Sequence, residues 1–159
     1  MATKTDTKRS QIKRAVKCKD TTPEMVVRRL VHSLGYRYRL HRSDLPGQPD
    51  LVFGPHRKLI FVHGCFWHGH TCKRGNHQPK TNADYWRKNI QVNKERDKST
   101  LEELHVGGWE TLVIWECETR QETPKQRIDT FLRSIKQMAN LSFPPVSSKY
   151  YADIAKQFL

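Results

Sequence analysis

Apolar and polar positions divide the first part of the chain into a helix and a strand. A helix is predicted from Thr22 to Gly35, because Thr22 can cap it, Pro23 suits its first turn and apolar residues recur at spacings of three and four. Residues 36–40 then alternate aromatic or apolar side chains with basic ones, which is typical of a half-buried strand. One face of this strand is expected to lie in the core.

Two short apolar runs follow, over residues 51–53 and 58–63. The tight turn at 54–57 between them predicts an antiparallel hairpin, and the second strand is expected to be central in its sheet. Asp50 stands at the start of the first strand and His63 at the end of the second. The hairpin would therefore place these two side chains next to each other at one end of the sheet.

A long helix is predicted over residues 82–105, with Asn82 as its cap. Residues at spacings of three and four form one stripe, which we expect to face the core. The stripe consists of Trp86, Ile90, Asn93, Asp97, Leu101 and Leu104. Asn93 and Asp97 interrupt that stripe with polar groups, and polar groups on a buried face need partners. The helix therefore predicts two polar contacts as well as apolar packing.

The remaining pattern completes a single domain of α/β class. Residues 109–115 form a third strong strand, and a helix with one apolar side begins at Thr123. The end of the chain is expected to be a connection and a short terminal helix. We expect one domain over residues 21–159, preceded by a basic arm or loosely docked helix over 1–20.

Charge points to a polyanionic partner. Lys and Arg number 29 against 16 Asp and Glu, a formal charge of +13, and a basic arm can follow a phosphate backbone. An anionic membrane surface is the rival partner, disfavoured because no strongly amphipathic basic helix stands out. The sequence has no apolar run of about 18 residues and no signal peptide, so no membrane association and a reducing cytoplasm are expected.

The cysteines favour a metal site. Cys65, His70 and Cys72 have the crowded spacing of a zinc knuckle, and Cys117 ends a strand that can pair beside them. Together they would form the closed tetrahedral set of thiolates and imidazole that Zn²⁺ prefers in structural sites. The spacing does not exclude His68 as the imidazole ligand. The alternative is a set of buried cysteines that only fill space.

Acidic and histidine side chains indicate a second, oxygen-rich site. A carboxylate at a strand start, Asp50, with a further group on the next strand, His63, suits Mg²⁺, which prefers oxygen ligands. Glu24 and Asp97 add carboxylates, and His68 is a candidate general base whose tautomer Asp97 would fix. The alternatives are that Asp50 is only a turn residue, that Glu24 is a helix-dipole partner and that Asp97 forms an ordinary ion pair with Arg96 or Lys94.

Aromatic side chains lie beside these candidate ligands. Phe66 and Trp67 stand in a polar loop, where apolar side chains can act as wedges that enter a base stack. Trp86 is ambiguous, because it also fits the apolar stripe of its helix. A core role is the alternative for all three.

Several runs of residues, in order from about Arg9 to Cys117, resemble the very-short-patch-repair (Vsr) DNA mismatch endonuclease family. The run from His63 to Cys72 is the most specific of them. The matching residues are Pro49-Asp50, Phe61-Val62-His63-Gly64-Cys65-Phe66-Trp67-His68-Gly69-His70-Thr71-Cys72, Pro79-Lys80-Thr81, Tyr85-Trp86, Asn93-Lys94-Glu95-Arg96-Asp97, Gly108-Trp109 and Ile114-Trp115-Glu116-Cys117.

The resemblance implies a restriction-endonuclease-like fold, a central mixed β-sheet flanked by helices, with a structural zinc site. It implies that Asp50 and the main-chain carbonyl of Val62 hold Mg²⁺, as two ions, and that His68, bonded to Asp97, is the base. It places His63 and Glu24 around the scissile phosphate and its metal-bound waters. It makes the zinc ligands Cys65, His70, Cys72 and Cys117, and the intercalating aromatics Phe66, Trp67 and Trp86.

The implied activity is a Mg²⁺-dependent nick 5′ to the thymine of a T:G mismatch in double-stranded DNA, the lesion left when 5-methylcytosine deaminates. The enzyme would start very short patch repair as a monomer in the bacterial cytoplasm, associated with the nucleoid, with mismatch-repair accessory proteins as further partners. The alternatives are a restriction-type or less selective endonuclease on the same fold, a non-catalytic zinc module that binds DNA, and a zinc hydrolase of small substrates. The last needs an open coordination position that four protein ligands do not leave.

Overall fold

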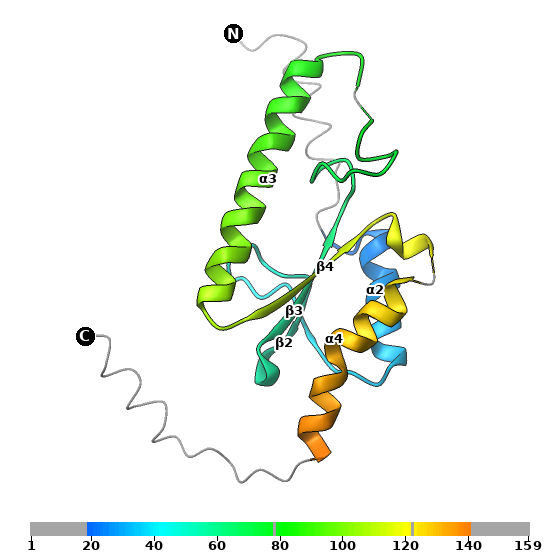
Figure 1. Ribbon diagram of the computed structural model, residues 1–159, viewed down its shortest axis with the longest axis vertical. Helices are drawn as coiled ribbons and strands as arrows, with labels where there is room; N and C mark the ends of the chain where they lie inside the picture. The colour runs from blue at the N-terminus through cyan, green and yellow to red at the C-terminus, as the bar shows by residue number, and fades with distance from the viewer. Residues whose placement is uncertain (1–18, 78, 122, 141–159) are drawn as a thin grey trace, which may run out of the picture.

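The computed structural model describes residues 19–77, 79–121 and 123–140 (Figure 1). Nearly all of the basic arm expected over 1–20 lies outside the described residues, and so does the terminal helix expected near the end of the chain. Within the described part, no helix is both long and apolar enough to span a membrane.

The core of the fold is a four-stranded mixed sheet in the order β1-β2-β3-β4. The β1-β2 and β2-β3 pairs are antiparallel, and β3 pairs in parallel with β4. The predicted hairpin and the central position of its second strand are therefore confirmed. The strands are β1 (Arg39–Leu40), β2 (Leu51–Phe53), β3 (Lys58–His63) and β4 (Glu110–Trp115).

Helices cover both faces of the sheet. Helices α2 (Thr22–Ser33) and α4 (Thr123–Asn140) lie together on one face, and α3 (Ala83–Val106) lies on the other (Figure 1). Successive strand residues point to opposite faces, so the two apolar clusters are made by alternate residues of the same strands. The first contains Leu51, Phe53, Ile60, Val27, Val31, Ile128 and Leu132, and the second contains Val52, Leu59, Phe61 and Leu104.

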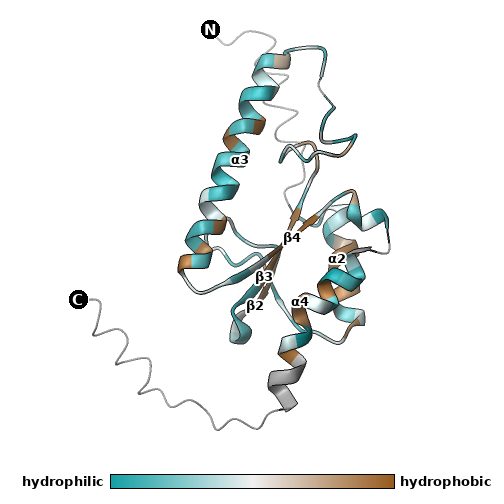
Figure 2. Cartoon of the chain, in the orientation of Figure 1, coloured by the Kyte–Doolittle hydropathy of each residue, from teal (hydrophilic) through white to brown (hydrophobic). Residues whose placement is uncertain are grey.

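The apolar residues of the strands lie between these two helical layers (Figure 2). Both β2 and β3 are buried along almost their whole length. This explains why the strands read as continuous apolar runs, because strands covered on both faces have no solvent-facing side.

The beginning of α2 differs by one residue from the prediction. Thr21, not Thr22, is the N-cap: its hydroxyl accepts from the backbone N–H of Glu24, and the Glu24 carboxylate accepts from the N–H of Thr21, each at 3.4 Å. Such a reciprocal box needs the glutamate three residues after the cap, a spacing that only Thr21 has. The strand predicted over 36–40 is shorter than expected, since only Arg39 and Leu40 pair with β2.

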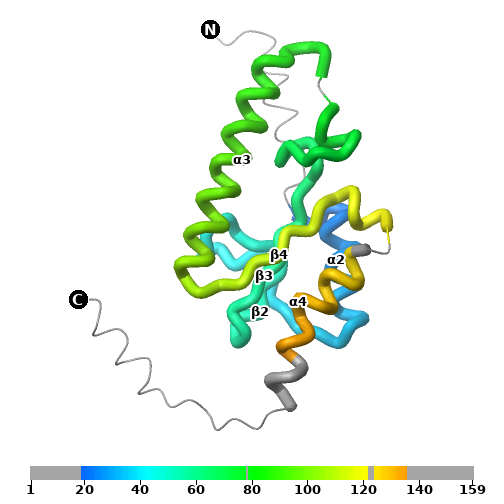
Figure 3. Tube along the Cα trace, in the orientation of Figure 1, coloured from blue at the N-terminus to red at the C-terminus, as the bar shows by residue number. Residues whose placement is uncertain are grey.

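Helix α3 also departs from its prediction. Asn82 precedes it in a left-handed conformation and makes no side-chain cap bond. Only the C-terminal end of the helix packs on the sheet, through buried Leu104 and half-buried Leu101. The rest extends beyond the sheet alongside the loop that follows β3 (Figure 3). The expectation that the whole stripe faces the core was therefore wrong, because most of it faces this loop.

Candidate active site and metal centre

A cleft of about 780 Å³ opens at the end of the sheet where β3 finishes. Its walls come from the start of α2, the segment between β1 and β2, the loop after β3, and α3. The lining includes seven of the residues that the sequence singled out as candidates for the site or for polar contacts: Asp50, Val62, His63, Trp67, His68, Asn93 and Asp97. The tertiary fold brings these residues together, because they lie on the β2-β3 hairpin, in the loop that follows it and on α3, which is distant in sequence.

Asp50 is half-buried and is held by the neighbouring strand. Its Oδ2 accepts a hydrogen bond of 2.7 Å from the backbone N–H of Val62. Burial raises the pKa of the Asp50 carboxyl to about 6; the bond from Val62 opposes this rise, and the negative charge of Glu24 adds to it. A cation beside Asp50 would favour its charged form. Carboxylate and carbonyl oxygens are the ligands that Mg²⁺ takes, so Asp50 and Val62 fit this ion.

His63, His68 and Asp97 form one connected group. The two imidazole rings stack with their centroids 3.9 Å apart and their planes 9° apart, and Nδ1 of His68 hydrogen-bonds to a carboxylate oxygen of Asp97. Burial opposes ionisation of Asp97, but the bond from His68 and its positive charge lower the pKa of Asp97 overall. An ionised Asp97 keeps the proton of neutral His68 on Nδ1 and leaves Nε2 as the basic nitrogen.

His63 is more buried than His68 and behaves differently. Burial lowers the pKa of His63 to about 4, and the positive charge of His68 contributes in the same direction. His63 is therefore neutral at physiological pH. It also contacts the edge of Trp115 at the end of β4, with ring centroids 5.5 Å apart. This packing fixes the ring on which His68 stacks.

Glu24 lies behind the wall of the cleft. It is only 1% exposed and does not line the cleft itself, whereas Thr21, Pro23 and His41 do. Its carboxylate contacts the N–H of Thr21, the Arg28 guanidinium at 3.3 Å and Nε2 of His41 at 3.1 Å. The structure thus places Glu24 close to Asp50 but covered by its neighbours.

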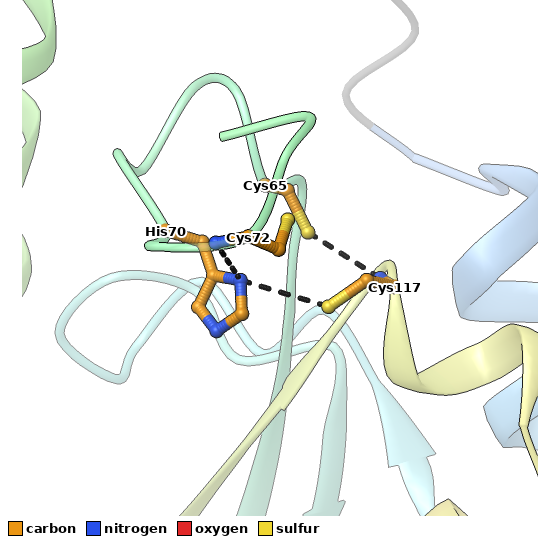
Figure 4. Close-up of side chains that lie close together, drawn as sticks. All are labelled: Cys65, His70, Cys72 and Cys117. Atoms are coloured by element: carbon orange, nitrogen blue, oxygen red, sulfur yellow. Dashed lines mark hydrogen bonds between the residues drawn. The ribbon is translucent and has the colours of Figure 1, made fainter. Parts of the chain in front are cut away.

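Four sulfur and nitrogen ligands gather in one place (Figure 4). Atoms of Cys65, His70, Cys72 and Cys117 all lie within 4.8 Å of one another, so these residues can hold a metal ion. Ligands about 2.0–2.3 Å from a tetrahedral Zn²⁺ are roughly 3.5 Å from each other, and Cys117 Sγ lies 3.6 Å from His70 Nδ1. His68, the alternative imidazole, is bonded to Asp97 instead.

The candidate wedge residues form a compact aromatic group. The rings of Phe66, Trp67 and Trp86 pack edge to face in all three pairs, with centroids 5.2–5.7 Å apart. All three side chains are half-buried and belong to neither apolar cluster. Trp86 is therefore part of the loop-helix contact and not of the core. Asn93 on α3 donates to the backbone carbonyl of Trp67 at 2.9 Å, which ties the loop to the helix.

Among the cleft residues that were not predicted from the sequence, two are polar and come directly after strands. His41 follows the last residue of β1, and Glu116 follows the last residue of β4. Glu116 accepts from the N–H of Cys65 at 3.4 Å and pairs with Arg74 at 3.2 Å, so it connects the strand to the metal-ligand loop. Only their position in the sequence could have identified His41 and Glu116 as site residues, since each comes directly after a predicted strand that ends near the site.

The fold and the site define the class first. The catalytic domain of the homing endonuclease I-Bth0305I matches with a TM-score of 0.50 over 72% of this chain and 97% of that domain, at 24% identity. The chain thus has the restriction-endonuclease-like fold, and the central mixed sheet flanked by helices is as expected.

Sequence comparison then gives the family. The family "DNA mismatch endonuclease Vsr" matches residues 1–74. The type II nicking enzyme V.XorIIP of Xanthomonas oryzae is 50% identical over 70% of this chain and 81% of its own length. The DNA mismatch endonuclease Vsr of Escherichia coli K12 is 38% identical over 70% of this chain and 71% of its own length. The chain belongs to the Vsr family and is a DNA endonuclease, which confirms the resemblance.

Proposed function

We propose that this endonuclease nicks one strand of double-stranded DNA 5′ to the thymine of a T:G mismatch, by Mg²⁺-dependent hydrolysis of the phosphodiester. The observation that carries the proposal is the cleft that half-buried Asp50 lines together with the His68–Asp97 pair. Membership of the Vsr family, with a mismatch endonuclease of E. coli among its relatives, supports the substrate.

Asp50 and the carbonyl of Val62 are the proposed ligands of two Mg²⁺ ions. Mg²⁺ held by these residues would supply Lewis-acid stabilisation of a phosphate and would lower the pKa of a coordinated water. The chain contributes a carboxylate whose orientation is fixed by the N–H of Val62. The raised pKa of Asp50, to about 6, is consistent with a site suited to a cation.

His68 is proposed as the general base. Its Nδ1 hydrogen is held by Asp97, so Nε2 can take the proton of the attacking water while Asp97 stabilises the imidazolium that forms. Neutral His63 stacks on this ring and limits its rotation. His63 and Glu24 are proposed to lie around the scissile phosphate, with Glu24 acting from behind the wall of the cleft.

DNA contacts are proposed from charge and shape. Lys19, Arg74 and Arg96 line the cleft and can pair with phosphates. The aromatic group of Phe66, Trp67 and Trp86 stands on the loop and helix at the cleft, which Trp67 lines, and it can enter the base stack at the mismatch. A mismatched pair is unstacked at lower cost than a matched one, which favours insertion there.

Zn²⁺ is proposed for the Cys65, His70, Cys72 and Cys117 cluster. Four protein ligands leave no open coordination position, so the ion would be structural. It would fix the loop that carries Phe66, Trp67 and His68 between two of its ligands. We further propose that the enzyme acts as a monomer in the bacterial cytoplasm, at the nucleoid, with mismatch-repair proteins as accessory partners.

A panel of nicking assays tests this function. Duplexes that differ only in one pair, T:G against C:G and T:A, are incubated with the zinc-loaded chain, with and without Mg²⁺, and the cut is mapped on each strand. We expect a single nick 5′ to the mismatched thymine that requires Mg²⁺. Equal cutting of matched duplexes would instead support a restriction-type or less selective nuclease. No cutting of any duplex would support a zinc module that only binds DNA.

A further inference from the structure

His41 occupies a special place at the cleft. The antiparallel pairing of β1 with β2 ends at Leu40↔Leu51, so His41 follows one strand and Asp50 precedes the other at the same end of the sheet. Both line the cleft. The backbone of His41 has a φ of 46°, a left-handed conformation that is uncommon for residues other than glycine and recurs at functional sites.

The imidazole of His41 lies against a buried carboxylate. Its Nε2 lies 3.1 Å from Oε1 of Glu24, although the ring is turned out of hydrogen-bond alignment, and no other described residue gives that nitrogen a hydrogen bond. The His41 side chain is 15% exposed and that of Glu24 only 1%. A carboxylate so completely buried needs cationic or donor partners to replace its lost hydration. A small rotation of the His41 ring would give the Glu24 carboxylate one more hydrogen-bond donor.

Glu24 has a second cationic partner besides His41. Arg28 pairs with the same Oε1 of Glu24 at 3.3 Å and also with Asp20. Its guanidinium already provides the cation of this cluster, which argues against a further metal ion there. Glu24 and His41 act in opposite directions on the pKa of Asp50, as a negative and a positive charge close to it do.

We propose that His41 is a positioning residue of the active site, which holds the buried carboxylate of Glu24 against the cleft wall beside Asp50. The site then has two carboxylate-histidine pairs, Asp97 with His68 and Glu24 with His41. This inference rests on the proposed function. Partners that orient groups around a metal site typically contribute about 10- to 100-fold to metal affinity or activity.

Two substitutions of His41 separate positioning from simple packing. His41→Leu keeps the bulk and removes the nitrogen that faces Glu24, whereas His41→Gln keeps a donor that can reach it. On a T:G duplex at saturating concentration, we expect His41→Leu to lower kcat about 10- to 100-fold and to raise the Mg²⁺ concentration needed for half-maximal rate. The KM for DNA should stay unchanged, and His41→Gln should remain close to wild type.

Controls make the result specific. His56→Leu changes a histidine on η1 (Gly54–His56), at the opposite end of the hairpin from the cleft, and should nick like wild type. Glu24→Gln with His41→Leu should be no slower than the slower single variant, because one residue acts through the other. If circular dichroism shows His41→Leu to be unfolded, His41→Asn, whose amide is too short to reach Glu24, replaces it.

Mn²⁺ binding to the full chain, followed by electron paramagnetic resonance, needs no substrate. This measurement therefore tests the role of His41 even if the enzyme proves not to nick T:G duplexes. We expect weaker Mn²⁺ binding by His41→Leu and near-normal binding by His41→Gln. The proposal is overturned by wild-type kcat and Mn²⁺ binding in His41→Leu, by equal losses in the Leu and Gln variants, or by losses that multiply with that of Glu24→Gln.

Discussion

Replacing Asp97 by Asn tests the proposed base most sharply, because it changes one atom of a defined contact. Asp97 accepts the Nδ1 hydrogen of His68. An asparagine can turn its amide nitrogen towards that position, where it would donate to Nδ1 and leave the ring hydrogen on Nε2. His68 would then present a hydrogen to the cleft and could not accept a proton there.

The size of the effect follows from the burial of the pair. The side chains of His68 and Asp97 are 19% and 18% exposed, so water cannot easily replace the missing acceptor. General-base catalysis contributes about 10²–10⁴-fold, and the substitution should remove most of it. We expect the nicking rate to fall about 10³-fold, equivalent to about 4 kcal/mol in the activation free energy.

The measurement is single-turnover nicking of a T:G duplex with enzyme in excess. Glu95→Gln is the matched control: it makes the same chemical change on the same helix at an exposed position, where the carboxylate contacts only Gln91 among the contacts described. It should cut at the wild-type rate. A less than tenfold loss in a folded Asp97→Asn enzyme that still binds DNA would refute the assignment of His68 as the base.

Three further predictions concern the two metal sites. Asp50→Ala should abolish nicking while zinc content and melting temperature stay at wild-type levels; retained turnover would remove Asp50 from catalysis. Cys117→Ser should lose bound zinc and lower the melting temperature together, and an unchanged melting temperature would contradict ligation by Cys117. Since burial raises the pKa of Asp50 to about 6, protons compete with Mg²⁺ below that pH. Calorimetric Mg²⁺ affinity should therefore weaken as the pH falls through 6 and level off at about pH 7 and above, whereas a flat profile would count against Asp50 as the ligand.

Much of the fold could be predicted because its strands and helices have strong local patterns. The runs that became β2 and β3 are apolar and separated by a tight turn, so both their existence and their antiparallel pairing followed from the sequence. The N-cap of α2 was misplaced by one residue because Thr21 and Thr22 are adjacent. The reciprocal spacing to Glu24 was the signal that distinguishes them.

Helix α3 shows where local pattern fails. Apolar residues at helical spacing predict that one face of the helix is covered, but they do not identify the element that covers it. Here the covering element for most of the helix is the loop after β3, and the polar residues within the stripe are those that contact it. Asn93 binds the backbone of Trp67, and Asp97 binds His68. The need of these two residues for partners was foreseeable, whereas the identity of the partners depends on tertiary packing.

The site residues divide in a similar way. Those in dense motifs, such as Cys65, His70 and Cys72, could be proposed from spacing, and the structure brings them together with Cys117. His41 lies outside any motif. It reaches the cleft because the pairing of β1 with β2 ends at Leu40↔Leu51, beside Asp50, and no local sequence pattern predicts that pairing.

Anomalous diffraction from crystals of the full chain grown with Mn²⁺ tests the central claim, that two metal sites of different chemistry lie close together. Data collected at the zinc edge should give one peak among Cys65, His70, Cys72 and Cys117. Data sensitive to manganese should give density against the Asp50 carboxylate and the Val62 carbonyl. Manganese bound instead at His63, His68 and Asp97, or at Asp20, Glu24 and His41, would contradict the account, as would a cysteine cluster without zinc.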